Sequence, residues 1–279
     1  MMKRRLLTFL LIFVGLGFLV YPIISKELYD KKISTQTLDY EKKINAEDDA
    51  KLKEEWQKAV VYNQNLKGDP VKDPFIVGSG IALPKDYQQV LNFPDNTMAV
   101  IDIPKISVKL PVYHGTSEGV LQKGIGHMEG TSLPIGGKGN HSVLTGHSGL
   151  AHSKMFTDLT SLEKGDLFFI HALDKVLAYK VDQIKVVTPD NLKYLATKTD
   201  EDYSTLITCT PYGINSHRLL VRGSRTKYLP EERKKIKPIK KETEADKILR
   251  NSVIITSTLM LFIILGALII KKRLTTKTK

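Results

Sequence analysis

The chain has very little cysteine: only one of its 279 residues, Cys209, is of this type. A single cysteine excludes an intramolecular disulfide, so an exported domain must rely on its core for stability. The seven histidines include no His-x-x-x-His or Cys/His pair at the spacing of metal ligands, so no catalytic metal is expected. No glycine-rich stretch opens an amphipathic helix, as a phosphate-binding loop requires, and no cofactor is predicted.

The sequence also lacks the basic patch of a nucleic-acid-binding protein. Its net charge is +12, but lysine and arginine are spread over the chain ends, the linkers and the central region without interleaved aromatic residues. We therefore expect solvated basic surface and no nucleic-acid partner. A length of 279 residues with 42% hydrophobic content, without internal repeats, indicates one domain of moderate size with appendages.

Two long apolar runs are present, one near each end of the chain. The first covers residues 6–24 after the basic cluster 3–5, and the second covers 253–270 before the basic cluster 271–273. Each run is close to the ~20 residues that cross a bilayer. The first lacks a small-x-small cleavage site, which favours a retained anchor over a removed signal peptide. The positive-inside rule then predicts cytoplasmic termini and an extracellular region between the runs.

A charged but periodic segment follows the first run. Between residues 35 and 66, apolar residues recur at multiples of four without Gly or Pro, which is typical of one or two amphipathic helices. The residues of this stripe are Tyr40, Ile44, Leu52, Trp56 and Val60. We expect a helical stalk or collar on the domain, anchored by Trp56. Two prolines in the next stretch, 68–75, break the helical pattern and predict a loop.

From residue 98 onward the pattern is that of an all-β domain. Residues 117–126 are expected to form a short helix or turn, residues 130–139 a loop, and residues 211–216 a reversal between two strands. The resulting seven or eight short strands are typical of a closed β-barrel. The predicted strands cover 98–103, 106–113, 141–146, 167–172, 176–188, 205–209 and 218–221.

The chemically informative stretch is 205–223, which is Thr-Leu-Ile-Thr-Cys-Thr-Pro-Tyr-Gly-Ile-Asn-Ser-His-Arg-Leu-Leu-Val-Arg-Gly. As strand, turn and strand, it brings Cys209 and Arg218 to the same rim. Positive neighbours favour the reactive thiolate, so a thiol beside a fixed cation is a candidate nucleophile. A lone cysteine is more often a small buried residue, and only its combination with Arg218 and a histidine is specific.

His147 is the candidate third member of this site. It ends a predicted strand in Leu144-Thr145-Gly146-His147-Ser148-Gly149, where the glycines let the backbone turn. His217 is next to Arg218 and is expected to face the other side of its strand. The remaining histidines are predicted to occupy strands or loops without chemical roles: His114, His127, His141, His152 and His171.

Stretch 205–223 resembles the active-site hairpin of the sortases, the membrane-anchored cysteine transpeptidases of Gram-positive cell surfaces. Its continuation after Cys209 is similar to the pilus-assembling class C branch. The Thr-Gly-His element at 145–147 also resembles the sortase histidine element, although class C members often carry Arg where this chain has Ser148. The resemblance covers about residues 40–226. It implies a closed sortase-type β-barrel of about eight strands, with N-terminal helices and two flanking transmembrane helices.

The resemblance also implies roles for individual residues. Cys209 is then the nucleophile that forms an acyl thioester, His147 the general acid and base, and Arg218 the group that stabilises the oxyanion and substrate. Asp73-Pro74-Phe75 resembles the class C lid, in which the aromatic ring covers the cysteine and the aspartate pairs with the arginine. Such a lid excludes substrate and water until it opens.

The implied reaction cleaves an LPxTG-like sorting motif of a pilin and transfers the acyl group to a lysine amine of another pilin. The partners are then pilins or surface proteins with this motif, at the plasma membrane. A housekeeping sortase, which anchors surface proteins to a cell-wall precursor, is the alternative within the family. The tripeptide 73–75 and the second apolar run favour the class C interpretation over it. A non-enzymatic membrane-spanning surface or assembly factor, with an inert Cys209, is the alternative from another class.

These features divide the chain into seven predicted segments. The basic stretch 225–241 is expected to act mainly as a solvated tether. The segments are a cytoplasmic start with an N-terminal transmembrane anchor (1–25), an amphipathic helical segment (26–67), a lid loop (68–80), the catalytic β-barrel (81–226), a basic linker (227–252), a C-terminal transmembrane helix (253–270) and a cytoplasmic tail (271–279).

Overall fold

The computed structural model describes residues 2–66, 73–75, 84–150, 153–198, 200–239 and 244–276. The chain forms two compact units. Unit 2, Asp30–Lys240, contains a β-barrel and the helical segments packed on it. Unit 1 combines the two chain ends, Met1–Tyr29 and Lys241–Lys279.

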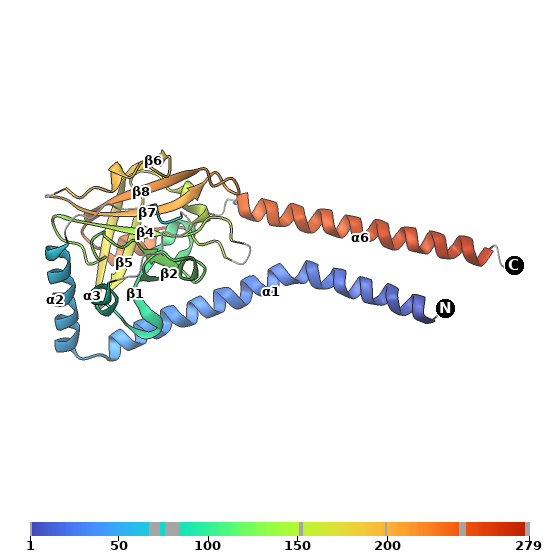
Figure 1. The fold of residues 1–279 in the computed structure, drawn as a ribbon, viewed down its shortest axis with the longest axis horizontal. Coiled ribbons are helices and arrows are strands. Elements are labelled where there is room, and N and C mark those ends of the chain that lie inside the picture. The colour runs from blue at the N-terminus through green and yellow to red at the C-terminus, as the bar shows by residue number, and fades with distance from the viewer. Residues whose placement is uncertain are drawn as a thin grey trace. The chain divides into compact units, whose positions relative to one another are not determined.

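Eight strands close into a barrel in the order β1-β2-β3-β4-β7-β8-β6-β5, as predicted from the sequence (Figure 1). The neighbours β2 and β3, and also β4 and β7, run parallel, while the other pairs are antiparallel. The bounds are β1 (Thr97–Ile103), β2 (Val108–His114), β3 (Ile125–His127), β4 (Asn140–Thr145), β5 (Leu167–Ala172), β6 (Lys175–Val187), β7 (Asp202–Thr210) and β8 (His217–Thr226).

The shortest strand, β3, was not predicted. The sequence indicated a short helix or turn over 117–126, and the structure has helix α4 (Glu118–Leu121) followed by β3. A strand of three residues is too short to show alternation, so its pairing with β2 and β4 defines it. Gly126 is required there because a Cβ atom would collide with the carbonyl oxygen of Gly115.

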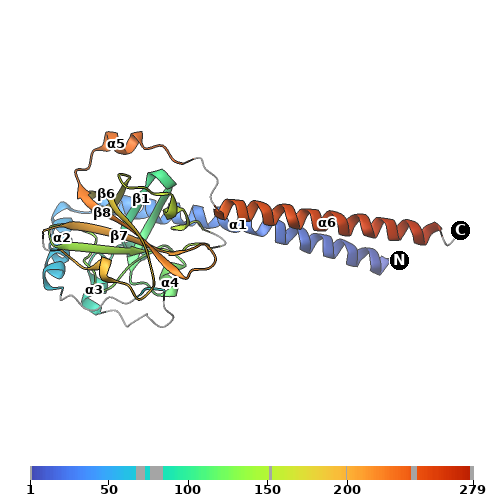
Figure 2. The same ribbon diagram turned by 90° about the horizontal axis from the view of Figure 1, so that it is seen from above.

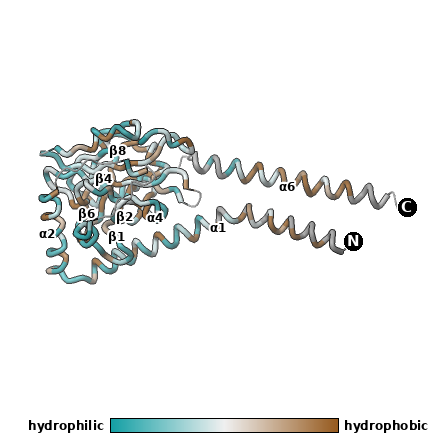
Figure 3. The backbone as a smooth tube through the Cα atoms, viewed as in Figure 1, coloured by the Kyte–Doolittle hydropathy of each residue, from teal (hydrophilic) through white to brown (hydrophobic). Residues whose placement is uncertain are grey.

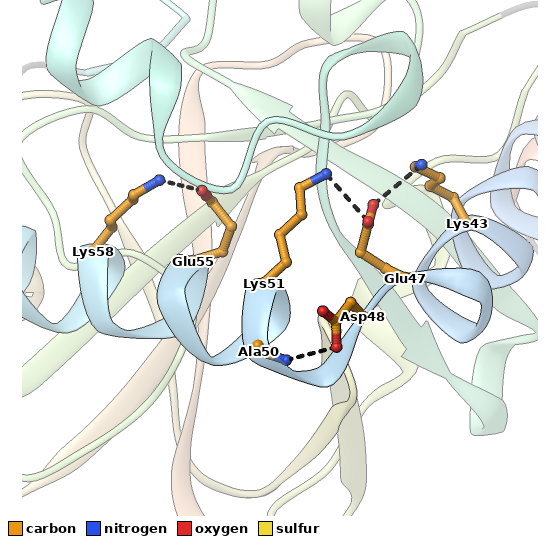
Figure 4. A network of polar contacts seen from close by, with 7 residues as sticks. All are labelled: Lys43, Glu47, Asp48, Ala50, Lys51, Glu55 and Lys58. Carbon is orange, nitrogen blue, oxygen red and sulfur yellow. Dashed lines mark hydrogen bonds and ion pairs between the residues drawn. The ribbon is translucent and has the colours of Figure 1, made fainter.

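Two helices cover part of the barrel wall. Helix α1 (Met2–Ala46) and helix α2 (Asp49–Asn65) are separated by Asp48, whose side chain caps α2 by accepting from the Ala50 amide at 3.2 Å (Figure 4). Glu47 pairs with Lys43 and Lys51 across this junction (Figure 4). Charged pairs at this spacing stabilise exposed helical turns.

The predicted apolar stripe packs on the barrel. Tyr40, Ile44 and Leu52 are buried, whereas Trp56 and Val60 are half-buried. The Tyr40 hydroxyl donates to the Met98 carbonyl at 3.4 Å and accepts from the Leu173 amide at 2.9 Å. The Trp56 ring lies 3.7 Å from Lys175 Nζ, a cation–π contact. The helices therefore pack on the barrel as a collar, but its buried anchor is Tyr40 rather than the expected Trp56, which is only half-buried.

Short helical segments and one long helix complete the described structure. Among the described residues, one stretch is long and apolar enough to cross a membrane: Arg250–Ile270, within α6, with a mean hydropathy of 2.8 (Figure 3). The first apolar run, 6–24, includes side chains outside the described residues and stays a prediction. The remaining elements are α3 (Lys85–Gln89), η1 (Pro94–Asn96), η2 (Pro104–Ile106), η3 (Thr157–Ser161), η4 (Lys193–Leu195), α5 (Pro230–Lys235) and α6 (Glu244–Thr276).

The basic stretch after β8 is docked on the barrel. Helix α5 lies in this stretch (Figure 2), and its Arg233 donates from Nε and Nη2 to Asp102 Oδ2 in β1, at 2.7 and 2.6 Å. The Tyr228 ring packs edge-on against Phe169, and the Ile239 amide donates to the Lys105 carbonyl. Asp102 is buried, and a buried carboxylate needs a partner of opposite charge. Residues 228–239 are thus attached to the barrel at these three contacts, while α5 has no buried residue and most of the stretch stays exposed, as expected of a solvated tether.

The pKa of Asp102 indicates the charge state in which this residue binds Arg233. Burial raises the pKa of Asp102, but the hydrogen bonds and positive charge of His171 and Arg233 outweigh it, and the pKa lies below its usual value. The ionised carboxylate is thus the form that holds α5.

We expect Asp102→Asn to release α5 from the barrel. Loss of a hydrogen-bonded ion pair of this kind costs about 1–3 kcal/mol, so tryptic cleavage within 233–237 should become at least about fivefold faster. Glu231→Gln is the matched control, because it removes an exposed pair with Lys234 on the same helix and should change little. Equal cleavage rates in Asp102→Asn and the wild type would contradict the docking contact.

Candidate active site

Strand β7 sets the positions of the predicted site residues. It pairs antiparallel with β8, and Cys209 lies directly opposite Arg218 in this register. Directly opposite residues of an antiparallel pair project from the same face, so the thiol and the guanidinium share one rim. The predicted strand–turn–strand arrangement of 205–223 is therefore confirmed.

The other edge of β7 brings in the histidine segment. Strand β4 pairs parallel with β7 up to Thr145 and Ile207. Beyond that pair, the Gly146 amide donates to the Ile207 carbonyl at 3.0 Å, and Thr208 Oγ1 donates to the Gly146 carbonyl at 2.7 Å. The residue before His147 is thus fixed to the residue before Cys209.

Gly146 is needed for close packing rather than for a turn. A Cβ atom there would lie 2.6 Å from Ile125 Cδ1 and 2.8 Å from the Phe156 ring. The Phe156 amide donates to the His147 carbonyl at 3.0 Å and fixes the backbone on the other side of this glycine. Of the two glycines near His147, Gly149, with a φ of +83°, is the one with the left-handed conformation expected of a turn glycine.

Arg218 is bound by Asp73 in a two-point contact. Its Nε and Nη2 donate to the two carboxylate oxygens at 2.9 and 2.7 Å, while Nη1 donates to the carbonyls of Asn215 and His217. The side chains of Arg218 and Asp73 are only 8% and 2% exposed. Such paired hydrogen bonds between a guanidinium and a carboxylate are among the strongest in proteins. Four of the five N–H groups of Arg218 therefore already donate hydrogen bonds, two of them to Asp73.

The aromatic ring of the same tripeptide lies against the histidine and the arginine. The ring centroids of Phe75 and His147 are 5.7 Å apart, and Arg218 Cζ lies 5.0 Å from the Phe75 centroid. The Phe75 ring also packs on the core cluster that includes Val143, Ile207 and Leu220. Pro74 is buried between the two contact residues. Of the predicted lid segment, 68–80, only 73–75 lie within the described residues.

The electrostatics of the thiol differ from the sequence expectation. Burial raises the pKa of Cys209 to about 11, Arg218 lowers it and Asp73 raises it. Asp73 thus counteracts the cation that was expected to favour the thiolate. Cys209 is 8% exposed, and with its pKa raised the thiol is protonated at neutral pH.

A further charged group approaches His147. Glu118 Oε1, at the start of α4, lies 3.4 Å from His147 Nε2. The sequence did not indicate this residue, because nothing in residues 117–122 distinguishes it from an ordinary exposed helix start.

The other described histidines have structural surroundings. His127 is fully buried, with Nδ1 2.8 Å from the Tyr87 hydroxyl and Nε2 2.8 Å from the Ser132 carbonyl oxygen, and burial lowers its pKa to about 4. Burial also lowers the pKa of His141 to about 4, and its Nε2 lies 2.7 Å from Thr205 Oγ1. His217 is exposed, and His152 lies outside the described residues. In the described part of the chain, no three potential metal ligands gather.

Comparison with known proteins identifies the family. Residues 101–226 match the Sortase domain. Sortase A of Bacillus anthracis is 31% identical over 163 residues, which are 57% of this chain and 75% of that protein. The chain belongs to the sortase family. Sortases are cysteine transpeptidases, which is the activity implied by the resemblance of stretch 205–223.

Solved structures similar to this sortase are class C enzymes. Sortase C-1 of Streptococcus pneumoniae is 44% identical, with a TM-score of 0.67, over 70% of this chain and 100% of that one. The pilus-related sortase C of Group B Streptococcus is 42% identical, with a TM-score of 0.64, over 69% and 97% of the two chains. Sortase C-1 of Actinomyces oris is 45% identical, with a TM-score of 0.62, over 64% and 99%.

We expect Asp73→Ala to activate the thiol of this sortase. Asp73 raises the pKa of Cys209, and its removal leaves Arg218 as an unpaired cation that lowers this pKa, so the pKa should fall. A decrease of one pKa unit raises the thiolate fraction at neutral pH about tenfold, and alkylation by iodoacetamide should accelerate at least that much.

Asp182→Ala provides the matched control for this experiment. Asp182 also binds an arginine through two hydrogen bonds, to Arg222 at 3.0 and 2.7 Å, but it is not part of the lid tripeptide. The rate at which iodoacetamide alkylates Cys209 in Asp182→Ala should equal that of the wild type. The same rate in all three proteins would show that Asp73 does not restrain the thiol.

Proposed function

We propose that this sortase polymerises pilins, with Cys209, His147 and Arg218 as its catalytic residues and Asp73-Pro74-Phe75 as its lid. The observation that carries this proposal is the convergence at the end of β7. The thiol and guanidinium are cross-strand partners, the histidine segment is tied to the same strand, and the Asp73 carboxylate occupies the arginine. The similarity to class C structures, one of them described as pilus-related, supports the choice of pilin substrates.

The lid must leave before substrate can bind. Arg218 donates to Asp73, so its hydrogen bonds are not free for a substrate carbonyl. Phe75 lies against His147, the group that must reach the leaving amine. Opening therefore releases the arginine, uncovers the imidazole and removes the carboxylate that raises the pKa of Cys209.

Acylation follows from the three groups. His147 accepts the proton of the Cys209 thiol as the sulfur attacks the carbonyl carbon of the threonine in an LPxTG-like motif, and Arg218 donates hydrogen bonds to the oxygen as negative charge develops. The C–N bond to glycine breaks, and His147 gives its proton to the departing amine. A lysine amine of the next pilin then attacks the thioester, which yields an isopeptide bond and restores the thiol.

We propose that both apolar runs anchor this reaction at the plasma membrane. Arg250–Ile270 supplies the C-terminal span, and residues 6–24 supply the N-terminal one. The basic clusters beside them then lie in the cytoplasm, and the barrel faces outward. Confinement to the same membrane raises the effective concentration of tethered pilins around the enzyme.

We expect the lid-opened Asp73→Ala enzyme to convert a purified pilin into a ladder of covalent products on a denaturing gel. Cys209→Ala should abolish the ladder, and His147→Ala and Arg218→Ala should each reduce the rate by at least about a hundredfold, because each removes a group needed in the transition state. His217→Ala is the control, since it is exposed and next to Arg218, and it should retain the ladder.

Two outcomes count against this function. A ladder that persists in Cys209→Ala contradicts the thioester mechanism. Peptide cleavage that depends on Cys209 but never produces pilin polymers favours the housekeeping alternative, in which the acyl group goes to a cell-wall precursor.

A further inference from the structure

The Glu118 carboxylate lies within ion-pair distance of the imidazole of His147. Oε1 is 3.4 Å from Nε2. Nε2 is buried, yet it has no hydrogen-bond partner among the described residues, and Glu118 is the one ion-pair partner described for this ring. A buried ring nitrogen without a hydrogen bond is unusual, and the nearest carboxylate is the natural acceptor for its proton.

The fold holds Glu118 at this place. It is the first residue of α4, whose Leu121 is 1% exposed and anchors the helix in the core. Helix α4 leads into β3, which pairs with β4, the strand that ends just before His147. Gln122 Nε2 donates to Glu118 Oε1 at 2.6 Å and fixes the carboxylate from the next turn. Glu118 is therefore built into the rim that carries the histidine.

The charges around His147 change when the lid opens. In the closed state, Arg218 is neutralised by Asp73. Once Asp73 leaves, Arg218 is an uncompensated cation against the Phe75 ring that also packs on the imidazole, and a like charge disfavours the protonated ring. Among the charged side chains described at the site, Glu118 is then the one carboxylate that remains. The reaction needs the protonated ring, because His147 gives its proton to the leaving amine.

We propose that Glu118 is a positioning residue for His147, which orients the ring and stabilises its protonated form in the lid-open enzyme. The proposal rests on the catalytic role proposed for His147. Glu118 does not touch substrate and acts through the imidazole. Its carboxylate is 70% exposed, so the effect is that of a partly screened pair and is modest.

The test compares Glu118→Gln with the full-length enzyme in the lid-opened Asp73→Ala background, using cleavage of a sorting-motif peptide from pH 5 to 10. We expect kcat/KM to fall about 2- to 5-fold, as for loss of an exposed ion pair. The limb of the pH profile that reports loss of the imidazole proton should shift to lower pH by about 0.3–0.7 pH unit. Glu118→Asp, which keeps the charge, should restore part of that shift.

Salt and a matched variant separate charge from structure. Raising the salt concentration should move the pH profile of the enzyme that retains Glu118 toward the profile of Glu118→Gln, because salt screens an exposed ion pair. Glu163→Gln removes another exposed carboxylate, paired with Lys105 at 3.2 Å, and should leave the profile unchanged.

A second readout does not depend on activity. The imidazole proton resonances of the histidine-labelled chain, with the His147 signal assigned by its loss in His147→Ala, report the titration midpoint of this ring directly. In Glu118→Gln the midpoint should fall by about the same 0.3–0.7 pH unit.

The outcomes are distinct. A uniform loss of rate with an unmoved pH profile and midpoint would mean that Glu118 only supports α4, and an unchanged enzyme would make it a bystander; either result overturns the proposal. A third outcome separates the two proposals. If the titration midpoint of His147 moves in Glu118→Gln, but the Asp73→Ala enzyme that retains Glu118 cleaves no peptide, the proposed function fails while the contact between Glu118 and His147 stands.

Discussion

The candidate site depends on the register of β7 between its two neighbours. The antiparallel pairing with β8 puts Cys209 opposite Arg218, and the parallel pairing with β4, extended through Gly146, brings the histidine segment to the same end. Side chains alternate between the two faces of a strand, so a shift of one residue in either register would send a member of the site to the other face. The closed barrel makes such a shift costly, because every strand is paired on both edges.

The buried pair of Asp73 and Arg218 determines the state in which this site rests. Removing two charges from water is costly, and the short hydrogen bonds between them offset that cost only while both partners stay together. The two side chains are therefore expected to be either fully paired or fully separated. In the closed state the arginine is occupied and burial keeps the pKa of Cys209 near 11. In the proposed mechanism, a substrate that binds Arg218 competes with Asp73, so opening of the proposed lid is coupled to the arrival of the pilin motif.

The sequence predicted the parts of this structure that are local. Alternation and turn residues indicated the barrel, the 205–223 hairpin and the amphipathic helices, and the family resemblance supplied the pairing of Asp73 with Arg218. The missed features arise from contacts between distant segments. Strand β3 is defined by its neighbours, Arg233 is held by a carboxylate 131 residues away, and Glu118 meets His147 only because α4 packs beside β3. The resting protonation of Cys209 was left open by the sequence, which allows an ion pair or a neutral pair with His147, because it shows the cation near Cys209 but not how deeply the thiol is buried.

The most direct test of the central claim is the intact mass of the lid-opened Asp73→Ala enzyme after brief mixing with a peptide that contains an LPxTG-like motif. The account predicts an added mass equal to the peptide up to its threonine, located on the fragment that contains Cys209 and removed by hydroxylamine. An enzyme that cleaves the peptide without carrying this acyl group, or that carries it on another residue, would contradict it.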